Sequence, residues 1–85
     1  MADDKLSVKI NFSAMIKKEP FEGRAVSISA KNNLGDFSVL PKHSNFITLI
    51  FDELEIDTGS RKIDYQFDRG VMKIENNEVD IFLGL

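Results

Sequence analysis

The sequence predicts an all-β domain, a small antiparallel β-sandwich of about eight to ten short strands. Two observations favour this class. Apolar and polar residues alternate with a period of two along most of the chain, and clusters of Gly, Asn, Asp and Ser interrupt the alternation at close intervals. Many short strands joined by tight turns are typical of sandwiches and barrels. The 85 residues suffice for one core, so we expect a single domain over residues 1–85.

The clearest strand is residues 6–12, where apolar side chains alternate with Ser7, Lys9 and Asn11. The other segments with strand character follow in chain order: 21–30, 37–40, 46–51, 54–57, 63–67, 71–75 and 79–83. Residues 46–51 form a nearly continuous apolar run, which predicts a strand buried on both of its faces.

Turn-forming residues separate these segments, and the clusters are 31–35, 57–60 and 76–77. Pro41 ends the short strand before it, because proline cannot donate a hydrogen bond to a sheet. Residues 15–22 have poor helical spacing and include Pro20, so no helix is expected there.

Composition excludes several functions. The chain has 14 acidic and 11 basic side chains, a formal charge of −3 and no cysteine. Disulfides, Cys-based metal sites and thiol catalysis are therefore absent, and broad nucleic-acid binding is disfavoured because it needs an excess of Lys and Arg. No apolar run reaches the roughly 18 residues of a membrane span. The acidic N-terminus lacks a signal-peptide core, and the simplest expectation is a cytosolic protein.

No catalytic motif stands out. His43 is the only histidine, and nothing in the sequence positions a nucleophile or carboxylate beside it, so a loop residue is the simpler interpretation. The acidic run at residues 52–57 lacks the spacing of a calcium loop and reads as a solvated strand face. The phenylalanines are spread along the strands, as expected of core residues. The residues alone indicate a binding or assembly module, with no cofactor and no metal.

Three stretches resemble a known family. They are residues 21–28, residues 35–44 (GDFSVLPKHS) and residues 70–81 (GVMKIENNEVDI). Their order and spacing are similar to those of the N-terminal β-sandwich of the F-type ATP synthase epsilon subunit, over roughly residues 6–83. The resemblance implies a non-catalytic rotor subunit, which joins the gamma subunit to the polar loops of the c-ring and couples proton or sodium flow to ATP synthesis.

The resemblance also implies site residues. Asp36 falls where the family has an acidic residue facing the c-ring, and His43 lies on the same loop side. Thr48 falls in the strand whose counterpart faces gamma, with Phe46 as an apolar contact beside it. The implied location is the cytoplasmic face of a bacterial inner membrane, peripheral to it and attached through the complex without direct insertion.

Departures from the family keep a second hypothesis open. Gly, Gly, Ala and Pro are usual where this chain has Ser38, Lys42, Ser44 and Asn45. A glycine at the position of Lys42 suggests a backbone conformation that costs other residues energy. The family also continues into a helical hairpin that regulates ATP hydrolysis and in some members binds ATP. The sequence ends before such a hairpin, so no inhibitory or ATP-binding role is expected here. The alternatives are a stand-alone adaptor derived from the epsilon fold and, with least support, a small hydrolase using His43.

Overall fold

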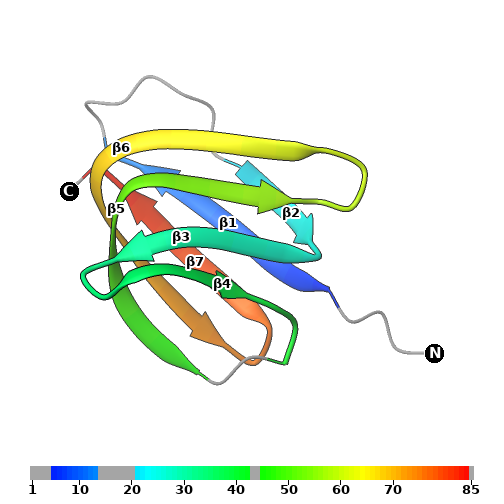
Figure 1. Cartoon of the computed structure of the whole chain (residues 1–85). Helices are drawn as coiled ribbons and strands as arrows, with labels where there is room; N and C mark the ends of the chain where they lie inside the picture. Colours follow the sequence, from blue (N-terminus) through cyan, green and yellow to red (C-terminus); the bar gives the residue numbers. More distant parts are fainter. Residues whose placement is uncertain (1–4, 14–20, 43–44, 85) are drawn as a thin grey trace.

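The computed structural model describes residues 5–13, 21–42 and 45–84, and its regular elements are all strands. They are β1 (Leu6–Phe12), β2 (Phe21–Ala25), β3 (Ser27–Asn32), β4 (Gly35–Val39), β5 (Phe46–Asp57), β6 (Lys62–Glu75) and β7 (Glu78–Leu83), as labelled in Figure 1. The all-β prediction is confirmed. The described residues form seven strands, fewer than expected. β5 and β6 each join two of the segments expected from the sequence, whereas the segment 21–30 divides into β2 and β3.

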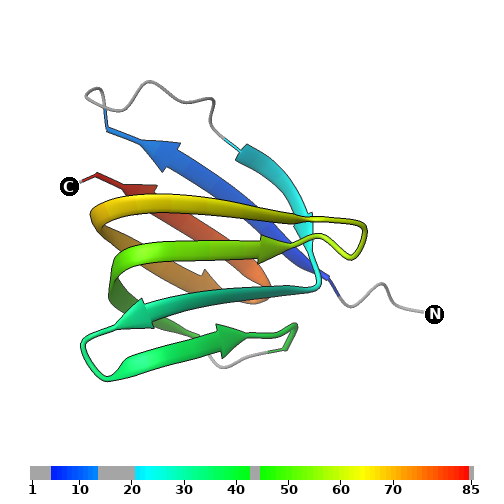
Figure 2. The same ribbon diagram turned by 45° about the horizontal axis from the view of Figure 1, so that its top comes forward.

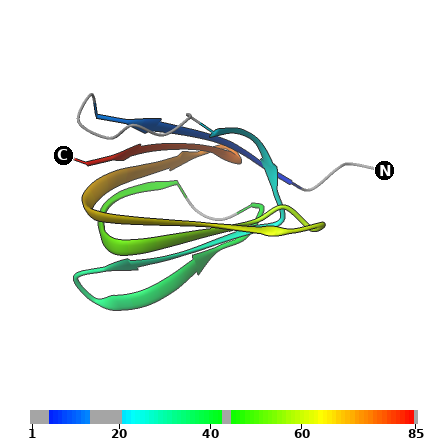
Figure 3. The same cartoon turned by 90° about the horizontal axis from the view of Figure 1, so that it is seen from above.

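One hydrogen-bonded sheet folds over on itself to make the sandwich. Its strand order is β2-β1-β7-β6-β5-β3-β4. β5 and β6 bend midway and continue from one layer into the other, as Figures 2 and 3 show where the two strands curve around the side of the molecule. The first layer contains β2, β1, β7 and residues 69–75 and 46–51. The second layer contains residues 62–67 and 53–57 together with β3 and β4.

The bend coincides with a β-bulge. The register between β5 and β6 shifts between Phe51 and Asp52, and Asp68 is the additional residue on β6. Asp52 has a φ of 72°, a left-handed backbone conformation that residues other than glycine normally avoid. Bulges of this kind increase local twist and bend the strand. The bulge therefore allows β5 and β6 to stay paired while they pass from one layer into the other.

Gly70 completes the bend on β6 through its lack of a side chain. A Cβ atom at this position would lie 2.7 Å from the carbonyl oxygen of Phe82 and 2.9 Å from Leu83 Cδ2. The first contact is with backbone, which cannot move aside without disturbing the pairing of β6 with β7. Close approach of the two strands thus requires glycine here.

The pairing is antiparallel throughout except at one place. β1 lies parallel to β7, with Val8 opposite Val79 and Ile10 opposite Ile81. The pure antiparallel arrangement expected from the sequence therefore holds for the other five pairings. The parallel contact brings the two ends of the described chain into neighbouring strands in the interior of the first layer, between β2 and β6.

The core lies between the layers, and the buried residues of the described chain are apolar or, for Tyr65, aromatic with one hydroxyl. No charged residue that the structure describes is buried, and the polar groups within buried surface include Tyr65 and the hydroxyl oxygen of Ser13, just after β1. The buried side chains are Leu6, Val8, Ile10, Ala25, Ile28, Ala30, Val39, Ile50, Leu54, Ile56, Tyr65, Met72, Ile74, Val79, Ile81 and Leu83. Most lie at alternate positions of their strands, which confirms the two-residue period as the signal for the core.

Two turns contain residues with positive φ, and only one of them uses a residue type that favours it. Asn76 and Asn77 have φ values of 52° and 65°, as a type I′ hairpin turn requires. Lys42 has a φ of 68°, in agreement with the conformation inferred from the glycine that the resembling family carries there. Thus the backbone shape at this position does not depend on glycine, and Lys42 adopts it at an energetic cost.

Candidate interaction surfaces

Asp36 is exposed on β4, close to the β3–β4 turn. Its cross-strand neighbour is Lys31, whose ammonium group lies 3.9 Å from the carboxylate of Glu53 on β5. The side chain therefore points outward from the second layer, where a partner can reach it. At the tip of the same hairpin, Leu34 is 89% exposed, and its N–H donates to the carboxamide oxygen of Asn32 at 2.8 Å. The hairpin presents an apolar side chain and a carboxylate together.

Phe46 and Thr48 lie on the inward side of β5. The Phe46 ring packs against the core and meets the Phe37 ring edge-on, with the ring centroids 6.1 Å apart. The Thr48 hydroxyl accepts a hydrogen bond from the Asn32 side chain at 3.4 Å and donates one to the carbonyl of Leu49 at 3.1 Å. Neither side chain shares an outward surface with Asp36. His43, the other residue singled out from the sequence, lies outside the described residues.

The prediction that residues 46–51 are buried on both faces is wrong. Ile47 is 67% exposed and Leu49 is 48% exposed, while Ile50 is completely buried. In a two-layer sandwich every strand has only one face covered by the opposite layer, and the outward positions here are apolar all the same. The outward half of the apolar run therefore forms a surface, not part of the core.

These outward side chains continue across neighbouring strands. Leu49 is paired with Val71 on β6, and Val71 is paired with Phe82 on β7, whose side chain is 41% exposed. We call Ile47, Leu49, Val71 and Phe82 the apolar face. Cross-strand neighbours on one face lie about 5 Å apart, so the four side chains form a continuous patch. Such patches on an otherwise polar surface mark protein contacts.

The row beside the apolar face is charged but balanced. Lys73, Asp80, Lys9 and Glu22 follow one another across β6, β7, β1 and β2 as cross-strand neighbours. Opposite charges alternate along this row, so it carries no net charge. The outer side of the first layer thus offers an apolar patch with a neutral polar border, the usual composition of a protein–protein interface.

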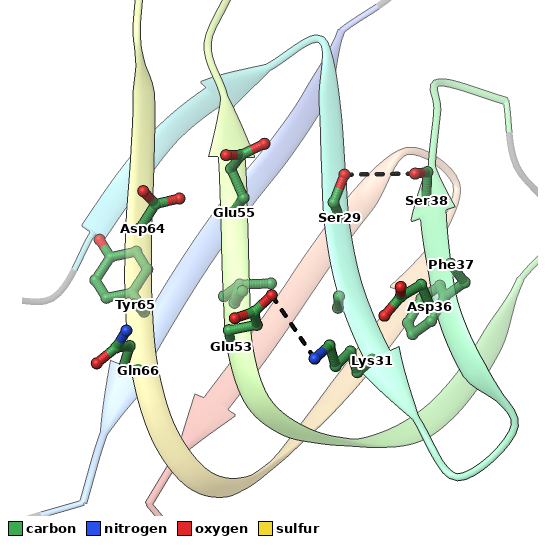
Figure 4. Close-up of a pocket in the computed structure, with 12 residues that line it drawn as sticks. Ser29, Lys31, Asp36, Phe37, Ser38, Glu53, Glu55, Asp64, Tyr65 and Gln66 are labelled. Atoms are coloured by element: carbon green, nitrogen blue, oxygen red, sulfur yellow. Dashed lines mark hydrogen bonds and ion pairs between the residues drawn. The ribbon is translucent and has the colours of Figure 1, made fainter.

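The outer side of the second layer has a different character. Figure 4 shows carboxylates from three strands around a shallow depression: Asp36 on β4, Glu53 and Glu55 on β5, and Asp64 on β6. Lys31 is the one basic side chain that lines it. This surface is negative, and it favours a basic partner through long-range attraction. The two outer sides of the sandwich therefore suit chemically different partners.

Chemistry at titratable groups is limited. Burial raises the pKa of the Tyr65 phenol above its ordinary value, and the nearby Arg61 guanidinium opposes the effect in part. Among the residues that the structure describes, no three His, Asp or Glu side chains converge in a way that could hold a metal ion. No helix of the described chain is long and apolar enough to cross a membrane.

Fold and surface together define a β-sandwich interaction domain. Residues 15–83 match the family model of the ATP synthase delta/epsilon chain β-sandwich domain. Because the match covers most of the sequence, the chain belongs to this family, as the sequence resemblance indicated. No curated protein matches the chain closely enough to count as a relative.

Solved structures share the fold. A chain in the cryo-EM structure of the Euglena gracilis mitochondrial ATP synthase (OSCP/F1/c-ring) is similar to this protein with a TM-score of 0.82 and 19% identity, covering 95% of this chain and 51% of that one. A chain in the Tetrahymena thermophila mitochondrial ATP synthase central stalk/c-ring structure gives a TM-score of 0.76 and 15% identity, covering 100% of this chain and 67% of that one. The chain thus spans about half the length of the first and two thirds of the second.

Proposed function

We propose that this domain is a non-catalytic central-stalk subunit of an F-type ATP synthase, which joins the gamma subunit to the c-ring and so couples proton or sodium flow to ATP synthesis. Membership of the delta/epsilon family and the likeness to chains in ATP synthase structures support the proposal. The observation that carries it is the apolar face, because a subunit that transmits torque needs an apolar contact area on a rigid support.

Gamma is the partner that we assign to the apolar face. Its outward side chains on β5 (Ile47 and Leu49) replace Phe46 and Thr48 as the main contacts, since the latter two point inward on the same strand. Thr48 keeps an indirect role, because its hydroxyl bonds to the carbonyl of Leu49. The gamma contact therefore stays on the strand expected from the sequence and moves to the opposite side of it.

The c-ring is the partner that we assign to the β3–β4 hairpin tip. Asp36 supplies a carboxylate for a basic residue of the polar loops, and Leu34 supplies exposed apolar area beside it. A charge at the rim of an interface mainly sets orientation and association rate. His43 remains a second candidate for this contact. The domain then sits at the membrane surface through the complex, on the cytoplasmic side of a bacterial inner membrane according to the sequence-based expectation.

Co-purification tests this function. The chain is used as bait with detergent-solubilised membranes of its own organism, and mass spectrometry identifies what it retains. We expect gamma, the catalytic subunits and the c-ring with the wild-type chain, and a loss of gamma with Leu49→Lys. Gln66→Lys is the matched control, because Gln66 is exposed on β6 in the other layer. Retention of a different protein by the wild-type chain, without gamma, would instead favour the stand-alone adaptor.

A further inference from the structure

β5 has an unpaired edge beside the apolar face. The strand is paired with β6 from Phe46 to Asp57, whereas β3 pairs with it only from Leu54 to Asp57. Residues 46–53 therefore have β6 on one side and no other strand of the described chain on the opposite side, and the bulge separates residues 46–51 from Asp52 and Glu53. We call the stretch before the bulge, residues 46–51, the open edge of β5.

Hydrogen bonds elsewhere in the sheet show which backbone groups face the open edge. The carbonyl of Arg69 accepts a hydrogen bond from the N–H of Gly84, which follows β7, at 2.8 Å. Backbone groups alternate between the two sides of a strand, so those of Gly70 face β5, where its partner is Ile50. Ile50 accordingly faces β6, and Leu49 presents its N–H and carbonyl to the open edge.

Ile47 has the same orientation as Leu49, because it lies two residues earlier on the same strand. The hydrogen bond from the Thr48 hydroxyl to the Leu49 carbonyl agrees with this assignment, since that carbonyl is turned away from β6. A carbonyl oxygen can accept a second hydrogen bond. Ile47 and Leu49 together thus offer a row of donors and acceptors spaced for strand pairing.

The open edge of β5 lacks the protection that the other sheet edges have. Each of the remaining edges carries charge: Glu22 and Arg24 on β2, Asp36 on β4, and Lys62 and Asp64 on the first half of β6. Residues 46–51 (FITLIF) carry none, and the first charges on this side of β5 are Asp52 and Glu53, at the bulge that ends the open edge. Natural proteins keep exposed edges from pairing with other chains by placing charges, prolines or bulges on them. An uncharged edge with exposed Ile47 and Leu49 is the kind that a partner covers.

We propose that the open edge of β5 receives a β-strand from the neighbouring central-stalk subunit, so that the partner's strand extends the first layer through backbone hydrogen bonds to Ile47 and Leu49. The proposal rests on the proposed function, which supplies this neighbour. The side chains of Ile47 and Leu49 also belong to the apolar face, so one partner subunit can cover this face and also pair with the backbone of the open edge. In strand addition of this kind the affinity comes from main-chain hydrogen bonds, and the specificity comes from the side chains beside them.

Residue-resolved amide hydrogen exchange tests the pairing directly. The isolated chain is compared with the same chain assembled with gamma. We expect the Ile47 and Leu49 amides to exchange rapidly in the isolated chain and at least tenfold more slowly in the assembly. The Thr48 and Ile50 amides face β6 and should be slow in both states. Fast exchange at Ile47 and Leu49 in an assembly that does contain gamma would overturn the proposal while leaving the proposed function intact.

Two substitutions at one position separate backbone pairing from side-chain contact. Ile47→Ala and Ile47→Pro both remove the exposed side chain, but only proline removes the N–H that faces the open edge. We expect the proline variant to bind gamma at least tenfold more weakly than the alanine variant. Equal affinities would contradict strand addition. Slow exchange at Thr48 and Ile50 shows that the proline variant keeps its pairing with β6.

The remaining outcomes concern the occupant. If the wild-type chain does not bind gamma at all, both this proposal and the proposed function fail. If the Ile47 and Leu49 amides become protected in the isolated chain as its concentration rises, and gamma adds no further protection, the occupant is a second copy of this chain and the proposal is overturned.

Discussion

The carboxamide oxygen of Asn45 accepts a hydrogen bond from the backbone N–H of Asn76 at 3.0 Å, which ties the start of β5 to the β6–β7 turn. A second bond runs in the opposite direction, from the N–H of Lys42 to the carboxamide oxygen of Asn77. Asn45 thus accepts a backbone N–H from the β6–β7 turn, and the turn residue Asn77 accepts the backbone N–H of Lys42 in return. The pair of bonds fixes the point from which the open edge of β5 begins.

Asn77→Ala should destabilise the domain by about 1–3 kcal/mol, because it removes the acceptor for the N–H of Lys42. Alanine is also less favourable than asparagine at a φ of 65°, since its side chain cannot hydrogen-bond to the local backbone. Asn77→Gly keeps the backbone conformation at low cost and should lose less. Urea unfolding of both variants measures the difference. Equal losses would show that the turn conformation contributes nothing.

Lys42→Gly should stabilise the domain by roughly 0.5–1 kcal/mol, because glycine adopts a φ of 68° without steric penalty. Lys42→Val should destabilise it, since β-branched side chains tolerate this conformation worst. Thermal unfolding of the two variants beside the wild type checks the order. A Gly variant less stable than the wild type would mean that the lysine side chain makes a compensating contact.

Gly70→Ala should destabilise the domain by more than about 2 kcal/mol, because the new Cβ collides with the carbonyl of Phe82 at 2.7 Å. Gly23→Ala is the control, since its nearest neighbour is the side-chain ring of Phe21 at 3.0 Å, which can rotate away. Denaturant unfolding should separate the two variants clearly. Similar small losses would indicate that the bend at the bulge is easily adjusted.

Tyr65 should make the stability of the domain depend on pH in the alkaline range. Burial raises the pKa of its phenol in the folded state, with Arg61 opposing in part, so the folded state holds the proton more tightly than the unfolded chain. The stability is complete below the unfolded pKa of about 10 and falls as pH rises through the folded pKa. Because Tyr65 is the only tyrosine and there is no tryptophan, absorbance at 295 nm follows its ionisation alone. Tyr65→Phe should abolish this part of the pH dependence, and an unchanged alkaline loss would contradict the assignment.

Asp36→Lys should weaken attachment of the stalk to the c-ring without unfolding the domain, because the exposed carboxylate is replaced by a charge of the wrong sign for a basic loop. Asp64→Lys is the matched control, since Asp64 lies on the same outer side but three strands away from β4. Coupling of ATP hydrolysis to ion pumping in the assembled enzyme is the measurement. Normal coupling with Asp36→Lys would remove Asp36 from the proposed contact.

The candidate surfaces were only partly predictable from sequence. Asp36 was found through its place in a family motif, and the structure exposes it, although its contact stays a prediction. The apolar face was missed, because Ile47 and Leu49 look the same in sequence whether they face a core or a partner. The available signal was an apolar run that does not alternate with polar residues. Such a run is ambiguous, because it does not tell which of its side chains face the core and which face a partner.

The strands and turns of this protein were determined largely by the sequence itself, because alternation, proline and left-handed asparagine act over only a few residues. Asn76 and Asn77 select their turn wherever the hairpin is placed. Tertiary structure decided how those strands were shared between layers: the run of β5 and β6 through the bulge, the parallel pairing of β1 with β7, and the exposure of Ile47. These features depend on which distant segments pair, and that choice is made by the burial of the whole core and by the close approach allowed at Gly70.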